Sequence, residues 1–381
     1  MGSPTSVTPL AGVYVHVPFC SAICNYCNFN RGLLDADLKR RYVAALVRQI
    51  EEASDGTGVD TIYFGGGTPS LLAAEEIEAV IGACRRAFAV AGDAEVTLET
   101  NPETVEPASL DGWRAAGINR LSLGVQSFRD DELRRLGRIH DGARARRAID
   151  GARAAGFDNL SLDLMMWLPG QQVAEWFESV DGLVAASPDH ASLYMLELYP
   201  GAPLRDEMAR SGWSLAPDED AAEMYVGGFE RLDRAGFEQY EISNVARPGH
   251  QSRHNLKYWT DGEWLAFGCG AHGTRAGTRW RNLPATDEYV ARVEAGVPVV
   301  AESRRLSPHD RFVEAMITGL RLSRGIDLDE VAVRYGVDVM ATYGDELTPA
   351  MEAGLLALDG RGLRLSRQGM LVANEIFRVF V

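Results

Sequence analysis

The chain has 381 residues, of which 46% are hydrophobic and 24% are charged, so it can bury a substantial core and is longer than one compact domain usually is. Its 54 acidic residues outnumber its 38 lysines and arginines, and the net charge of -16 excludes a broad positive field for nucleic-acid phosphates. The beginning, MGSPTSVTPLAG, has neither a basic segment nor an apolar one, and no run approaches the roughly 18 apolar residues of a membrane span. We therefore expect a soluble cytoplasmic protein with no nucleic-acid partner and no transmembrane segment. Peripheral contact with a membrane stays possible for such a composition.

Six short apolar runs alternate with amphipathic stretches over roughly the first 235 residues. Such alternation is typical of βαβ units and a parallel sheet. Six repeats are too few for a closed eight-stranded barrel, so they predict an α/β fold with a curved, partly open (β/α)6 barrel whose chemistry lies at the carboxyl ends of the strands. The expected strands are 13–17, 59–64, 94–99, 120–125, 160–166 and 191–198. The expected helices are 38–53, 74–88, 107–115 and 143–155, several of them followed closely by glycine.

After about Gly236 the pattern becomes loop-rich, with FEQYEISNVARPGHQSRHNLKYW and a glycine cluster, GCGAHG. Beyond Pro308 helical patterns return, and LLALDGRGLRLSRQGMLVANEIF predicts a helix, a β-hairpin turning at 359–362 and a last helix. We therefore expect a partial barrel over 1–235, a connecting region over 236–305, and a small winged-helix-like α+β domain over 306–381.

Three of the five cysteines, Cys20, Cys24 and Cys27, lie in one short loop after the first predicted strand. This pattern suits a cytosolic metal site better than a disulfide framework. Three thiolates from one loop are soft ligands suited to an iron-sulfur cluster, in which one iron is left for a ligand other than protein. Zinc is the metal alternative, but no nearby fourth cysteine and no paired Cys-x-x-Cys completes a tetrahedral site, and only His16 could serve as a fourth ligand. Buried, inert cysteines are the remaining alternative.

The sequence GGGTP at 65–69 directly follows the second predicted strand, where residues without side chains let a ligand approach the backbone closely. A glycine run alone also fits an ordinary flexible turn. The next strands end in Glu99, Gln126 and Asp163, so polar residues gather at the face where a barrel builds its site. Carboxylates there suit an ammonium group or ribose hydroxyls, whereas helix N-capping is their structural alternative.

The CxxxCxxC spacing after YVHVPF, together with GGGTPS at 65–70, resembles the radical S-adenosylmethionine (SAM) proteins of the coproporphyrinogen dehydrogenase group, over essentially the whole chain. The resemblance implies a [4Fe-4S] cluster held by Cys20, Cys24 and Cys27. Its open iron would be chelated by the amino and carboxylate groups of SAM, and its reduction would cleave the sulfonium to a 5'-deoxyadenosyl radical. The SAM contacts implied in the same way are Tyr14, Tyr26, Gly66, Gly67, Thr68, Glu99, Gln126, Arg138 and Asp163.

Two features qualify this assignment. Arg138 has a structural alternative as a solvated charge on a helix. Relatives commonly carry glycine before Leu-Pro-Gly after the fifth strand, whereas this chain has Trp167, whose ring would narrow the pocket or pack under it.

Three differences separate two branches of the group. The dehydrogenases carry a further cysteine two residues after the third and a longer N-terminal arm, whereas here Asn28 and Phe29 follow Cys27 and 19 residues precede Cys20. The third difference is RHNLKYW at 253–259, which resembles the HNxxYW motif of the HemW-type haem chaperones and is followed by the GCGAHG stretch also seen there.

The chemistry of that motif suits haem, because a neutral imidazole is a good axial ligand and aromatic rings can flank a porphyrin. His254 is therefore the first candidate for haem contact, with His272 and Cys269 as weaker ones, although a lone histidine among aromatics is more often structural. The resemblance implies a HemW-like protein of porphyrin metabolism that binds the cluster, SAM and haem, passes haem to acceptor apoproteins, and forms a homodimer.

Three other functions stay open at this stage. They are an oxygen-independent coproporphyrinogen III dehydrogenase, a radical SAM methyltransferase, and a non-enzymatic scaffold that retains a structural cluster. The sequence leaves open whether the chain is an enzyme, which protein accepts the haem, and whether SAM is cleaved.

Overall fold

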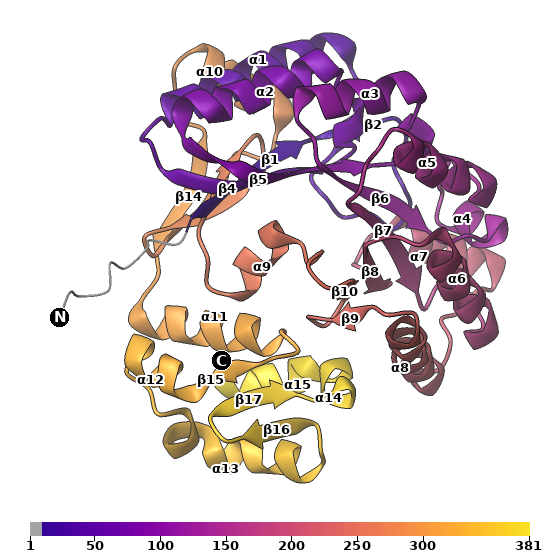
Figure 1. Cartoon of the computed structure of the whole chain (residues 1–381), viewed down its shortest axis with the longest axis vertical. Coiled ribbons are helices and arrows are strands. Elements are labelled where there is room, and N and C mark those ends of the chain that lie inside the picture. Colours follow the sequence, from indigo (N-terminus) through magenta and orange to yellow (C-terminus); the bar gives the residue numbers. More distant parts are fainter. Residues whose placement is uncertain (1–9) are drawn as a thin grey trace.

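One curved sheet organises the protein in the computed structural model, which describes residues 10–381 (Figure 1). Its order is β14-β13-β12-β11-β1-β4-β5-β6-β7-β8-β10-β9. The central strands run parallel to one another. They are β1 (Ala11–Val17), β4 (Gly58–Gly66), β5 (Ala89–Thr100), β6 (Arg120–Gln126), β7 (Leu160–Met166) and β8 (His190–Met195). The predicted α/β class and its six parallel strands are confirmed. The last strand ends three residues short of the predicted 198, because the chain turns away at Leu196 into the pocket described below.

Helices cover the outer face of this sheet (Figure 1). Those predicted from the sequence begin and end within two residues of the expected bounds. Local signals explain the accuracy: Asp35 and Asp141 cap helix starts by accepting backbone N–H bonds, and Gly117 ends a helix with a φ of 108°. The helices around the barrel are α1 (Ala36–Glu52), α2 (Ala74–Ala87), α3 (Pro107–Ala116), α4 (Asp130–Arg135), α5 (Gly142–Ala154), α6 (Val173–Ala186), α7 (Pro203–Ser211) and α8 (Asp218–Arg234).

The stretch after Gly236 is not loop-rich as predicted, because it extends the sheet at both edges. At one edge β11 (Trp264–Phe267) pairs with β1 and leads into the antiparallel β12 (His272–Arg275), β13 (Thr278–Asn282) and β14 (Val300–Arg305). These strands escape sequence reasoning because they are short and rich in arginine, glycine and threonine, so their pairing is imposed by tertiary context. At the other edge lie β9 (Glu238–Gln239) and β10 (Asn244–Ala246).

Helix α9 (Arg253–Trp259) lies within the concave side of the sheet, between the barrel strands and the C-terminal helices (Figure 1). Helix α10 (Thr286–Glu294) packs beside α1 on the outer side (Figure 1). Residues 253–305 therefore complete the barrel rather than merely joining it to the C-terminal region.

The C-terminal region forms a helical unit with a β-hairpin, as predicted. The hairpin turns at Gly360 and Arg361, and β15 (Ile326–Asp327) pairs with its second strand. The predicted last helix is divided at Val372 into two short ones. The elements are α11 (Pro308–Leu320), α12 (Leu328–Tyr335), α13 (Val339–Glu352), β16 (Leu356–Asp359), β17 (Gly362–Leu365), α14 (Arg367–Leu371) and α15 (Ala373–Phe377).

Shorter elements complete the structure. The strands β2 (Phe19–Cys20) and β3 (Gly32–Leu33) flank the cysteine loop, which we define as residues 20–31. The 3-10 helices are η1 (Pro69–Leu71), η2 (Pro102–Thr104) and η3 (Arg378–Phe380). Among residues 10–381, no helix combines the length and apolar character needed to cross a bilayer.

Candidate functional site

A cavity of about 300 Å³ opens at the carboxyl ends of the central strands, which we call the barrel mouth. This is the edge at which parallel-stranded barrels build their sites. The cysteine loop closes one side of it, and the ends of β4 to β8 form the rest of the wall. Most of the residues predicted from the sequence come together here, and their roles toward a ligand stay predictions. Those on the wall are Cys20, Cys24, Cys27, Tyr26, Gly66, Gly67, Thr68, Glu99, Gln126, Arg138 and Asp163.

The cysteine thiols of the loop are free and face donors that favour a thiolate. The Thr68 hydroxyl lies 3.5 Å from Cys20 Sγ, and Arg138 Nη1 lies 3.5 Å from Cys24 Sγ. Burial raises the pKa of the Cys20 and Cys27 thiols, so each thiolate gains from an added positive partner such as a metal. Inert burial, the structural alternative, does not describe a loop whose thiols line an open cavity.

The donor set fits an iron-sulfur cluster better than a single metal ion. Within the described part of the chain, no three His, Cys, Asp or Glu side chains stand close enough to share one ion. Zinc requires its ligands to converge on one atom, whereas each cysteine of a cubane binds a different iron. His16 is not available as a fourth ligand, because its ring nitrogens bond to the Tyr14 hydroxyl at 3.1 Å and the Asn30 carbonyl at 2.8 Å.

Two partly buried carboxylates on the cavity wall, those of Glu99 and Asp163, have no ion-pair partner among residues 10–381. Glu99 accepts hydrogen bonds from the Tyr63 hydroxyl at 2.8 Å and from the Gly66 N–H at 3.2 Å. Burial, reinforced by the nearby Asp163, raises the pKa of Glu99 to about 7. Burial likewise raises the pKa of Asp163 to about 6. Neither residue caps a helix, so the N-capping alternative is wrong, and both are poised to accept a cation or hydroxyl donors from a ligand.

Arg138 is partly buried and hydrogen-bonded within the protein rather than a solvated charge. Its guanidinium donates to Asn101 Oδ1 at 2.7 Å and to the Gly124 carbonyl at 3.0 Å, and it also reaches Cys24. It therefore joins the ends of β5 and β6 to the cysteine loop. The solvated-charge alternative for this residue is wrong.

The glycines at the end of β4 are required by the packing of the protein itself, in addition to letting a ligand approach the backbone. Gly66 has a φ of 117°, and a Cβ there would lie 2.6 Å from the His16 ring. A Cβ at Gly67 would lie 2.7 Å from the Phe19 carbonyl and 3.0 Å from Cys20 Sγ. The GGG segment thus allows the cysteine loop to close directly onto β4.

Two non-glycine residues at strand ends adopt left-handed backbone conformations. Gln126, the last residue of β6, has a φ of 67°, and Trp167, which follows β7, has a φ of 61°. Such strain clusters at binding sites, and Gln126 faces the cavity. Trp167 is not on the cavity wall, since its indole N–H donates to the Ala216 carbonyl at 2.8 Å and its ring packs against the core.

Two predicted residues lie away from the cavity wall. Tyr14 lies below the wall, stacked on Tyr63 with ring centroids 6.3 Å apart. His254 is fully buried on α9, with its ring 5.1 Å from that of Tyr63. Its nitrogens bond to Thr61 Oγ1 at 2.8 Å and to the Tyr258 hydroxyl at 2.9 Å.

The HNxxYW motif therefore forms the floor of the barrel in this conformation. Burial lowers the pKa of His254 to about 3, so the ring is neutral, but neither nitrogen is free for iron. Lys257 pairs with Asp60 at 2.6 Å, and the Trp259 ring lies under Arg321 at 4.4 Å. Contact between His254 and haem stays a prediction that would require α9 to move.

Sequence reasoning missed much of the apolar side of the cavity. Met165 follows Asp163 on β7, and Tyr194 and Met195 end β8, where alternation with the polar residues could have marked them. Asn101, two residues after Glu99, was also missed. The further lining residues are Phe29, Arg31, Ser122, Gly124, Leu196 and Glu197.

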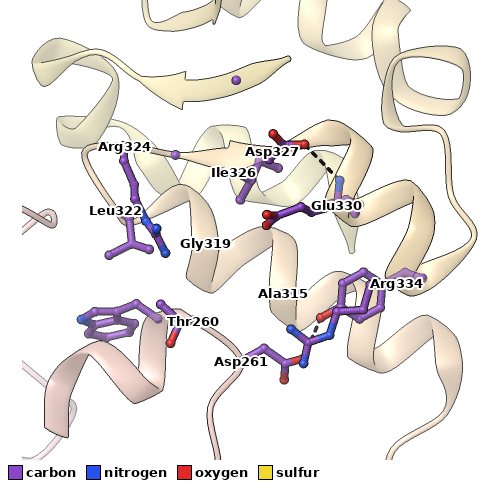
Figure 2. Close-up of a pocket in the computed structure, with 15 residues that line it drawn as sticks. Thr260, Asp261, Ala315, Gly319, Leu322, Arg324, Ile326, Asp327, Glu330 and Arg334 are labelled. Carbon is purple, nitrogen blue, oxygen red and sulfur yellow. Dashed lines mark hydrogen bonds and ion pairs between the residues drawn. The ribbon is translucent and has the colours of Figure 1, made fainter. Parts of the chain in front are cut away.

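A second cavity, of about 350 Å³, lies between the end of α9 and the C-terminal unit (Figure 2). Two of its charges form an ion pair: Asp261 bonds to Arg334, and it also accepts from the Tyr335 hydroxyl, each at 2.6 Å. Asp327 caps α12 by accepting from the Glu330 N–H at 3.0 Å. The contacts of Asp261 join the barrel floor to the C-terminal unit.

Comparisons with known proteins agree with this geometry. Residues 14–182 match the model of the radical SAM superfamily, and residues 306–372 match the HemN C-terminal domain. The "Heme chaperone HemW" of Bacillus subtilis is 33% identical over 98% of this chain and 99% of that protein, and that of Mycobacterium tuberculosis is 37% identical over 97% and 94%. The mitochondrial "Radical S-adenosyl methionine domain-containing protein 1" of Bos taurus is 35% identical over 98% of this chain and 89% of its own. Among solved structures, coproporphyrinogen III oxidase from Escherichia coli shares the fold, with a TM-score of 0.86 at 23% identity over 98% of this chain and 90% of its own.

Proposed function

This chain belongs to the radical SAM superfamily and, within it, to the family of the HemW haem chaperones, and from that premise we propose that it binds haem and passes it to acceptor apoproteins. The proposal includes a [4Fe-4S] cluster and SAM at the barrel mouth. The observation that carries it is the convergence of three free thiols and two unpaired carboxylates on one cavity.

Cys20, Cys24 and Cys27 would hold the cluster, with one iron left for SAM. Thr68 and Arg138 support this role, because their donors stabilise thiolate sulfur. A reduced cluster, when bound, can supply the electron that cleaves the sulfonium bond of SAM.

The carboxylates and the strand-end backbone would orient SAM. Glu99, which already accepts the Gly66 N–H, would take the ligand's ammonium group, and Asp163 would accept from ribose hydroxyls. Gly67, Thr68 and Gln126 complete this wall, and Tyr26 covers the side nearest the cysteines.

The rim of the mouth offers a surface for an apolar, flat ligand. Ile23, Phe29 and Leu33 are 47%, 63% and 63% exposed, and Tyr194 and Met195 are 42% and 39% exposed. Phe29, Tyr194 and Met195 also line the cavity. Exposed apolar side chains around a cavity are typical of binding surfaces, and they suit both a porphyrin and an apoprotein that receives it.

The test uses anaerobically reconstituted protein. We expect a Soret band when haem is added, followed by its movement to an added apo-haem protein, and no vinyl product from coproporphyrinogen, SAM and a reductant. Vinyl product would favour the dehydrogenase, and failure to bind haem would reject the chaperone. Size-exclusion chromatography of the same sample tests the homodimer that the family resemblance implies.

A further inference from the structure

The seven histidines of the chain differ in whether their rings are available to a ligand. Four of them are buried, and His16, His190 and His254 have both ring nitrogens hydrogen-bonded to neighbouring oxygens. The fourth, His140, bonds through Nε2 to the Val125 carbonyl, and its Nδ1 lies 3.3 Å from the Glu103 carboxylate. The other three are His250 before α9, His309 at the start of α11, and His272 at the start of β12. His272 is the exposed histidine that lies beside the cysteine loop.

The GCGAHG turn fixes this position. Gly268 has a φ of 96°, and a Cβ there would lie 2.7 Å from the His16 carbonyl. Gly270 has a φ of 69°, and a Cβ there would collide with the amide of Asn30. Both positions need glycine because the turn is pressed against the chain segments that carry the cysteines.

Asn30 fastens the end of the cysteine loop to this turn. Its amide donates to the Cys269 carbonyl at 3.2 Å and to the Pro284 carbonyl at 3.0 Å. Cys269 itself is fully buried, so it packs inside the turn and is closed to a ligand. His272 leaves the turn as the first residue of β12, close enough to His16 to influence its titration.

A guanidinium shares the face of the sheet with this imidazole. His272 and Arg281 are directly opposite in the antiparallel ladder of β12 and β13, so their side chains are neighbours. Arg281 forms an ion pair with Glu302 at 2.6 Å, and the two side chains are 39% and 70% exposed. Because an exposed ion pair contributes little stability, an incoming carboxylate can take the place of Glu302 at little cost. Burial and then Arg281 lower the pKa of His272, which keeps the ring in the neutral form that binds iron.

An exposed aromatic ring lies on the cysteine-loop side. Phe29, the residue before Asn30, is 63% exposed and lines the barrel-mouth cavity. His272 and Arg281 therefore share one face of the β12–β13 ladder, and Phe29 belongs to the loop that Asn30 fastens to the neighbouring turn. A neutral imidazole, a cation and an apolar ring are the three groups that iron, a propionate and the porphyrin face require.

We propose that His272 is the axial ligand through which this chain holds haem at the barrel mouth, with Arg281 paired to a haem propionate and Phe29 against the macrocycle. The inference rests on the proposed haem-chaperone function. A ring nitrogen of His272 donates its lone pair to the iron and displaces a water molecule, with no change in oxidation state. Haem held there lies beside the cluster loop and on the exposed rim from which an acceptor can take it.

The experiment titrates haemin into reconstituted wild type, His272→Ala, Arg281→Gln and His309→Ala, and records difference spectra against the same protein without haem. His272→Ala should shift the Soret band and weaken binding about tenfold or more, because the iron loses its protein ligand. Arg281→Gln should weaken binding with the Soret position unchanged. His309→Ala, which removes an exposed histidine from α11, should match wild type, and iron content and the melting temperature should be equal in all four proteins.

The outcomes separate the two proposals. If wild type binds haem and His272→Ala gives the same spectrum and affinity, the His272 site is wrong while the chaperone function stands. If His309→Ala shows the same loss as His272→Ala, the site is also wrong, because the loss then does not depend on the position of His272. If wild type binds no haem, both proposals fall.

Discussion

The mouth and the floor of the barrel contain similar polar side chains, but they hold them differently. At the floor, Glu95 accepts the backbone N–H groups of Arg253 and His254, each at 3.1 Å, and Lys257 pairs with Asp60. At the mouth, Glu99 and Asp163 are partly buried with no cation bonded to them in the described residues, and their pKa values are raised.

A buried carboxylate without a cation is costly, and a ligand that supplies the cation recovers the cost. At the floor, the polar side-chain atoms of His254 and Lys257 are paired within the protein, whereas the two carboxylates at the mouth have no ion-pair partner among residues 10–381. The hydrogen-bond partners of a polar side chain show whether it is already paired within the protein, whereas the residue types of a motif do not.

The sharpest test of the mouth is Cys24→Ala, which should abolish the cluster. Wild type reconstituted anaerobically should hold about four irons per chain with broad absorption in the visible, because three thiolates and an exchangeable ligand satisfy a cubane. The matched control is Cys84→Ala, since Cys84 is buried in α2 and burial raises its pKa to about 12. Iron analysis that finds an intact cluster in Cys24→Ala would overturn the assignment of the loop.

The next largest effect should follow Glu99→Gln, which removes an ionised acceptor but no iron ligand. Loss of a hydrogen bond to a charged group costs about 1.5–3 kcal/mol, so calorimetry should report SAM binding weakened about 10- to 100-fold with iron content unchanged. Asp163→Asn should act in the same direction. Glu106→Gln, at an exposed ion pair with Arg144, is the control that should leave affinity unchanged. Unaltered affinity in both mouth variants would mean that these carboxylates do not contact SAM.

The pH dependence of SAM binding should be a smaller effect with a defined sign. Glu99 has a pKa of about 7, so it must lose a proton to receive an ammonium group, and affinity should fall about tenfold per pH unit as the pH decreases below about 7. The fold without ligand should show the opposite trend, since a raised carboxyl pKa favours folding at low pH and this contribution is lost as the pH rises through about 7. Glu99→Gln should flatten both curves, and a wild-type binding curve that is flat between pH 6 and 8 would contradict the role of this proton.

Sequence reasoning recovered the parts of this protein that local chemistry determines. The central strands are continuous apolar runs because both sheet faces are buried, and helix bounds follow from residues such as Asp35 and Gly117. The cysteine loop and GGGTP could be placed at the barrel mouth from the sequence, because each of them follows a predicted strand.

The remaining features depend on contacts between distant segments. Three of them are the pairing of β11 with β1, the closure of Asn30 onto the 268–271 turn, and the position of α9 inside the sheet. Asn30 and Cys269 are 239 positions apart, and Thr61 and His254, which hold α9, are 193 apart. The periodic pattern of apolar residues in the sequence does not reveal such contacts. Contact between His254 and haem stays a prediction, because a motif names side chains without their partners, and Thr61 and Tyr258 become the partners of His254 only in the fold.

The smallest expected effect on ligands, and the one that tests the floor, is that of His254→Ala. Removing the ring leaves a cavity against Tyr63 and deprives Thr61 and Tyr258 of a buried partner, so the free energy of unfolding should fall by about 2–4 kcal/mol. Thr61→Val removes the same bond from its other end, and the double variant should lose less than the sum of the single losses in urea titrations because the pair is coupled. Haem and SAM affinities of the folded variants should equal those of wild type, since the ring reaches neither the cavity nor the rim. A variant with unchanged stability but weakened haem binding would instead show that α9 opens and that His254 contacts haem. The floor would then be a second binding region, and the distinction between floor and mouth would be wrong.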